Sequence, residues 1–108
     1  MKVNLKYVFK DLNGDPMTLK QKKDGKSVDV PMELGDICMK SLMMIDPGEI
    51  VDPGEKYERA TIGEKIWKKG EVELEPEEID LLKRLIGEKG SPVVVKQSWD
   101  ILDPKVFS

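Results

Sequence analysis

Alternating hydrophobic and polar residues open the chain. Over residues 3–10 the apolar side chains fall on one side of an extended backbone and mostly polar ones on the other, which predicts a half-buried β-strand. Asn13-Gly14 follows, and this pair tolerates the positive φ angles of tight hairpin turns. We therefore expect a β-hairpin at the start of the chain. The residues on the apolar side are Val3, Leu5, Tyr7 and Phe9.

The alternation resumes after this turn. Met17 and Leu19 alternate with polar residues up to about Gln21, which predicts the return strand of the hairpin. Residues 22–27 are polar and contain Gly25, so they indicate a second turn. Residues 28–30 alternate again before Pro31, and a short third strand is expected there.

From residue 34 the hydrophobic period changes from two to that of a helix. The apolar positions up to residue 45 recur at spacings of three and four, and three methionines widen the stripe, which predicts a first helix. Two Asp-Pro-Gly-Glu runs follow, at 46–49 and 52–55. Each Pro-Gly pair suits the centre of a type II turn, so residues 46–55 are expected to form a loop. The stripe residues are Leu34, Ile37, Cys38, Leu42 and Ile45, with Met39, Met43 and Met44 beside them.

Three more helices are predicted. The second spans residues 55–69 and ends at Gly70, and a brief extended connection at 71–74 follows. The third begins at Pro76 and ends near Gly87 or Gly90. The fourth covers residues 92–102, although the β-branched run at 93–95 leaves a strand as the alternative. Residues 103–108 are expected to form a tail. The broad apolar face of the second helix holds Tyr57, Ala60, Gly63, Ile66 and Trp67.

These elements predict one α+β domain over residues 1–108. An N-terminal antiparallel β-hairpin of two or three short strands, within residues 1–31, is expected to pack on about four α-helices within residues 34–102. The expected core is led by Leu42, Ile66, Trp67, Leu82, Ile86, Val95, Trp99 and Leu102.

Charge is distributed unevenly along this chain. The net charge is −3, and charged residues make up 36% of the sequence. Residues 1–26 hold seven lysines against three aspartates, so the remainder is strongly acidic. This asymmetry indicates either two binding faces or exposed strands protected by lysine, and we favour the second interpretation.

The sequence suggests a cytoplasmic protein. A single cysteine allows no internal disulfide. No apolar run approaches the roughly 20 residues that span a bilayer, so no membrane segment is expected. No secretory signal is predicted either.

The residue types and motifs of the sequence give little support for a catalytic or cofactor site. The chain lacks histidine, which removes the usual general base at neutral pH and the common nucleophile pairs. A carboxylate pair could still act as acid and base, but the acids fall in turns and at helix starts, where solvent exposure is expected. No glycine-rich phosphate loop is present. We therefore expect no enzyme, no cofactor and no small-molecule substrate.

Two candidate metal sites are also rejected. Cys38 has no second cysteine or histidine with which to bind zinc, and its place in an apolar stripe predicts a core residue. The acids of the two Asp-Pro-Gly-Glu runs do not match the register of a calcium-binding loop, so we interpret them as solvated turn residues. These acids are Asp46, Glu49, Asp52 and Glu55.

Protein binding remains the main hypothesis. Methionine is adaptable and tryptophan is a common interface anchor, although both also fill small cores, and we favour the core for Trp67 and Trp99. A face around Met43, Tyr57 and Trp67 is nevertheless the first place to look for a protein partner or for self-association.

A second candidate surface is the basic N-terminal ribbon. A two-stranded ribbon can enter a nucleic-acid groove and aromatic residues can stack on bases, but Tyr7 and Phe9 belong to the face expected to cover the core. Nucleic-acid binding is therefore possible but not favoured. The candidate lysines are Lys6, Lys10, Lys20, Lys22 and Lys23.

Several short segments follow one another along the chain: residues 55–59 (Glu-Lys-Tyr-Glu-Arg), 65–67 (Lys-Ile-Trp), 72–79 (Val-Glu-Leu-Glu-Pro-Glu-Glu-Ile) and 91–95 (Ser-Pro-Val-Val-Val), with Gln97 and Trp99. Their order resembles that of small proteins of unknown function encoded by bacteriophages and prophages. The resemblance covers most of the chain, but Glu75 stands where such proteins often have a Ser or Thr helix cap. It implies a phage or prophage setting in a bacterial host and assigns no functional residue.

The sequence therefore predicts a small non-enzymatic protein-binding or regulatory factor. A self-assembling structural or assembly accessory of a phage particle is the first alternative, and a nucleic-acid binder that uses the basic ribbon is the second.

Overall fold

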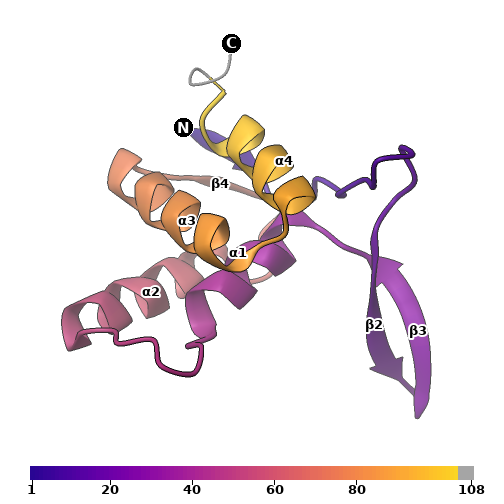
Figure 1. Cartoon of the computed structure of the whole chain (residues 1–108), viewed down its shortest axis with the longest axis horizontal. Helices are drawn as coiled ribbons and strands as arrows, with labels where there is room; N and C mark the ends of the chain where they lie inside the picture. The colour runs from indigo at the N-terminus through magenta and orange to yellow at the C-terminus, as the bar shows by residue number, and fades with distance from the viewer. Residues whose placement is uncertain (105–108) are drawn as a thin grey trace.

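The computed structural model describes residues 1–104 and confirms the α+β class. Four helices form the body of the molecule, and two small antiparallel sheets of two strands each accompany them (Figure 1). The strands are β1 (Lys2–Asn4), β2 (Thr18–Lys23), β3 (Lys26–Pro31) and β4 (Glu71–Glu73), and the helices are α1 (Leu34–Met43), α2 (Pro53–Ile66), α3 (Pro76–Lys89) and α4 (Pro92–Leu102).

The first strand differs from its prediction. Only Lys2–Asn4 is a strand, and it pairs with β4. The predicted hairpin at Asn13-Gly14 is reduced to a bridge between Lys10 and Pro16. The backbone bonds of Leu5 explain the early end, because its N–H donates to the Gly70 carbonyl while its own carbonyl accepts from Gly35. The burial that the apolar alternation predicted is nevertheless confirmed, since Val3, Leu5 and Phe9 are all buried.

The hairpin lies one turn later than expected. Strands β2 and β3 pair in register from Thr18 opposite Pro31 to Lys23 opposite Lys26. Asp24 and Gly25 form the two-residue loop, with φ angles of 52° and 77°. Asp-Gly favours this double positive-φ turn, which matches the twist of the strands. We call β2, β3 and their turn the hairpin arm (residues 18–31).

The hairpin arm projects from the body (Figure 1). Within the described chain, β2 and β3 pack extensively only on each other. Three backbone hydrogen bonds fix the base: Phe9 donates to Met32, Met32 donates to Met17, and Met17 donates to Phe9. The expectation that the whole ribbon packs on the helices is therefore correct only at its base.

The helical predictions agree closely with the structure. Helix α1 ends at Met43 and α2 spans Pro53–Ile66, two or three residues from the expected bounds. The segment at 92–102 is a helix, so the strand alternative is wrong. Helix α1 packs on both α2 and α3, and α4 packs on α3. The predicted tail at 103–108 lies mostly outside the described residues.

The core forms where α1 and α3 meet. Five of the eight predicted core residues are buried, while Val95 and Trp99 are partly buried and Trp67 is exposed. No helix within residues 1–104 is long and apolar enough to cross a membrane. The buried apolar set is Val3, Leu5, Phe9, Leu34, Cys38, Leu42, Ile62, Ile66, Leu74, Ile79, Leu82, Leu85, Ile86, Val94 and Leu102.

Cys38 lies in this core, as predicted, and should be chemically inert. Burial raises the pKa of its thiol to about 12, and the thiolate is the reactive form. We expect no reaction of the folded protein with a thiol-specific disulfide reagent at about pH 8. The denatured chain, as the control, should release one equivalent of chromophore. Rapid stoichiometric labelling of the folded protein would contradict the burial.

Candidate functional site

A hollow of about 350 Å³ opens between α1 and α2. We call it the α1–α2 hollow. Among the residues proposed from the sequence, Met43 and Trp67 line it together, with 50% and 57% of their surface exposed. The prediction of Trp67 as a core residue is therefore wrong. The lining residues are Met39, Met43, Ala60, Gly63, Glu64 and Trp67.

The end of α2 explains the exposure of Trp67. The helix stops at Ile66, and Trp67 is the capping residue, whose N–H donates to the Gly63 carbonyl at 2.9 Å. Lys68 then adopts a left-handed φ of 58°. The prediction had continued the helix to residue 69, which placed Trp67 beside Ile66 on the apolar face. The early stop instead leaves the indole at the rim, where the Lys68 ammonium lies 5.5 Å from its ring centre.

Gly63 allows the hollow to form. A Cβ atom at this position would lie 2.3 Å from the terminal methyl of Met43 and 3.6 Å from that of Met39. Both thioether side chains therefore rest against the bare backbone of α2. The sequence contained a signal for this contact, because a glycine inside a helical pattern indicates close approach of another element. Glu64 is the lining residue that was not predicted from the sequence, whereas Met39, Ala60 and Gly63 were predicted on the apolar faces of the two helices.

Tyr57 does not belong to this hollow. It is 76% exposed, but it lines a separate hollow of about 180 Å³ that faces α3. Thr61 and Leu81 lie in the same lining. Of the three predicted binding residues, Met43 and Trp67 therefore lie together, whereas Tyr57 lies on another face of α2.

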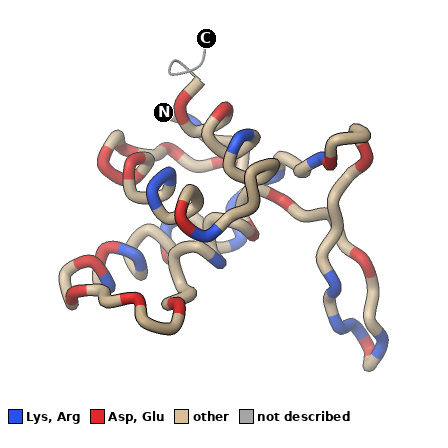
Figure 2. The backbone as a smooth tube through the Cα atoms, viewed as in Figure 1, with Lys and Arg blue, Asp and Glu red and all other residues tan. Residues whose placement is uncertain are grey.

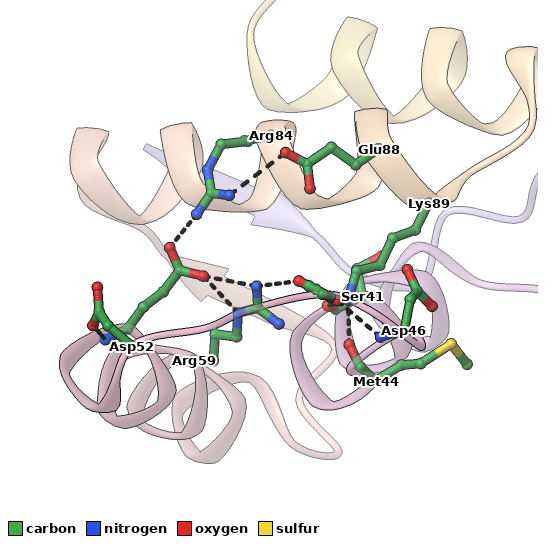
Figure 3. A network of polar contacts seen from close by, with 10 residues as sticks. Ser41, Met44, Asp46, Asp52, Arg59, Arg84, Glu88 and Lys89 are labelled. Atoms are coloured by element: carbon green, nitrogen blue, oxygen red, sulfur yellow. Dashed lines mark hydrogen bonds and ion pairs between the residues drawn. The ribbon is translucent and has the colours of Figure 1, made fainter.

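A buried ion network holds α2 against the preceding loop and α3 (Figure 3). The Arg59 guanidinium, 3% exposed, donates from Nη2 to Glu49 at 2.8 Å and to Glu55 at 2.7 Å. Lys89 of α3 contacts Glu49 at 3.2 Å, and Arg84 pairs with Glu55. The interpretation of these two acids as solvated turn residues is therefore wrong.

The network also controls the protonation of Glu49. Its hydrogen bond from Arg59 is the main cause that lowers the pKa of this carboxyl from 4.5 to about 2. Asp52 of the repeat caps α2 by accepting from the Glu55 N–H, and the backbone N–H of Asp46 donates to Glu49. Within residues 1–104, no group of three or more Cys, Asp or Glu side chains is arranged to hold a metal ion.

The fold separates the lysines of the predicted basic ribbon from one another. Lys20, Lys22 and Lys23 lie on β2 of the hairpin arm, and Lys20 pairs with Asp29 at 2.7 Å. Lys6 lies outside the arm, with its side chain beside Gly70. Lys10 is held at the body, where its backbone exchanges hydrogen bonds with the Gln97 amide. The structure adds Lys26 of β3 to the arm lysines.

Comparison with protein-family models, curated proteins and solved structures finds no match to this chain.

Proposed function

We propose that this protein is a small non-enzymatic binding factor that receives an apolar segment of a partner protein in the α1–α2 hollow. One observation carries the proposal: Met43 and Trp67 are half exposed side by side, although the chain folds a complete core without them. Tryptophan supplies much of the energy of many interfaces, and methionine adapts its shape to the partner. The cytoplasmic location and the phage or prophage setting remain predictions that rest on the sequence.

The chemistry of the hollow indicates the kind of segment it would bind. Its wall is apolar, and Glu64 and Lys68 supply one charge of each sign near Trp67. An apolar anchor flanked by polar residues would fill the hollow and leave both charges at a solvated rim. Such an arrangement suits a short helix or loop of a partner better than a strongly charged ligand.

We expect Trp67→Ala to abolish this binding. Truncation of a central tryptophan costs at least about 2 kcal/mol, or roughly thirtyfold in affinity. The immobilised chain would be incubated with a lysate of the cells that naturally express it, and bound proteins would be quantified by mass spectrometry. At least one protein retained by the wild type should be lost with Trp67→Ala and with Met43→Lys.

Tyr57→Ala is the matched control, because it removes a more exposed aromatic residue from the same helix but outside the hollow. This variant should retain the same protein. Thermal unfolding should show that all three variants fold, since half or more of each replaced residue's surface is exposed. The proposal fails if no captured protein depends on Trp67, or if Tyr57→Ala removes the same protein.

A further inference from the structure

Within residues 1–104, no surface covers the hairpin arm. Its two strands pack extensively only on each other, and an isolated two-stranded hairpin is at best marginally stable in water. One face carries Leu19, Val28 and Val30, all only partly buried. Four lysines against two aspartates make the arm basic, and Lys22, Lys23 and Lys26 near its tip form no ion pair within residues 1–104.

The opposite charge gathers at the other end of the molecule. Residues 71–80 contain six carboxylates and no lysine or arginine. Glu73 binds the N-terminal ammonium and Glu78 binds Lys65, whereas the exposed Glu77 and Asp80 form no ion pair within the described chain. Figure 2 shows the arm's lysines at the lower right and acidic residues around the start of α3 at the upper left.

An apolar hollow lies beside these acids. It measures about 450 Å³, and Asp80 stands in its wall. This end of the molecule therefore offers both features that the arm would require, namely apolar surface for its half-buried face and carboxylates for its lysines. The apolar side chains that line the hollow are Met1, Pro76, Ile79, Leu102 and Pro104.

From this complementarity we infer that the hairpin arm docks onto the 71–80 end of a second copy of the chain. Because the two complementary surfaces lie at opposite ends of one molecule, each copy can use its arm on one neighbour and its acidic end on another, in a head-to-tail contact. Such contacts repeat from copy to copy and produce a ring or an open filament instead of a closed pair. The inference goes beyond the proposed function, since it uses neither Met43 nor Trp67.

Nucleic acid fits the arm less well. The net charge of the chain is −3, so only a small local basic surface would face a phosphate backbone. The partly buried Leu19, Val28 and Val30 would also gain no apolar contact from phosphates. A protein surface with both acids and apolar side chains satisfies the arm more completely.

Sedimentation velocity over a range of protein concentrations tests the inference. At about 0.01 M salt, where charges act over about 30 Å, the mass should rise with concentration beyond that of a dimer. At about 1 M salt the screening length falls to about 3 Å, and the assembly should weaken. Reversing two tip charges with Lys22→Glu and Lys23→Glu should raise the concentration needed for assembly at least about tenfold.

A charge-swap mixture provides the decisive measurement. Reversing the other surface with Glu77→Lys and Asp80→Lys should also prevent assembly of that variant alone. An equimolar mixture of the two double variants should assemble again, because each arm then meets an end of opposite charge. Recovery in the mixture also shows that both variants are folded, which circular dichroism would confirm.

Lys56→Glu with Lys69→Glu is the matched control. It makes the same charge change at two exposed lysines outside both surfaces, and it should assemble like the wild type. The inference is overturned if the wild type stays monomeric at low salt, if assembly survives both charge reversals, or if the mixture fails to recover. Retention on DNA or RNA through Lys22 and Lys23, with a monomer in the absence of nucleic acid, would equally overturn it.

Discussion

Replacing Phe9 with alanine is expected to lower the free energy of unfolding by about 3–5 kcal/mol, the range for truncation of a buried aromatic side chain. Phe9 is fully buried, and its ring packs edge-on against Tyr7 with 5.6 Å between ring centres. Its backbone also bonds to Met17 and Met32 at the base of the hairpin arm. The variant would therefore leave a cavity where the arm joins the body. Urea unfolding followed by circular dichroism measures the loss.

Leu12→Ala is the control for this prediction. It removes an apolar side chain three residues further on, but Leu12 is 90% exposed, so the free energy of unfolding should change by no more than about 0.5 kcal/mol. Phe9→Leu keeps much of the buried volume and should cost less than Phe9→Ala. Equal losses for Phe9→Ala and Leu12→Ala would show that Phe9 does not anchor the arm.

Replacing Arg59 with leucine is expected to cost about 3–5 kcal/mol, because removal of the buried cation that joins Glu49 and Glu55 leaves both carboxylates only partly compensated. Glu49 loses its closest cation and keeps Lys89, Glu55 keeps Arg84, and Glu49 is only 18% exposed. The loop before α2 should detach from α2 and α3 as a result. The exposed Lys56→Leu on the same helix serves as the control and should change stability little.

The response to acid provides a second measurement of the same network. The folded-state pKa of Glu49 is about 2, below its ordinary 4.5. A carboxyl with a lowered pKa stabilises the fold above about pH 4.5, and this contribution is lost as the pH falls toward 2. The wild type should therefore lose more stability over this window than Arg59→Leu, which lacks the main cause of the shift. Parallel pH profiles for the two proteins would contradict this assignment.

Much of the fold could be predicted because its signals are local. The apolar spacing of α1 and α3, Pro76 and Pro92 at the first helical positions, and the turn around Gly25 each lie within a few residues. The pairing of β1 could not be predicted in this way. Its partner β4 lies about 70 residues further on, and a period of two shows which side chains are buried but not which strand lies alongside.

The candidate site was only partly predictable for a related reason. Met43 and Trp67 were recognised as residue types common in interfaces, but their meeting depends on the α1–α2 contact and on the absence of a side chain at Gly63. Tyr57 lines a different hollow, between α2 and α3. The network around Arg59 was missed because its acids and cations come from a loop and two helices separated in the chain.

The sequence by itself determined the α+β class, the four helices, a turn around Gly25 and the burial of Val3, Leu5, Phe9 and Cys38. Hydrophobic periodicity and turn-forming residues act over a few positions, so they can be recognised in the amino-acid sequence. Only the tertiary structure decided that β1 pairs with β4, that Trp67 lies at the surface, and that basic and acidic surfaces face away from each other. Those outcomes depend on where distant segments meet, which local spacing does not encode.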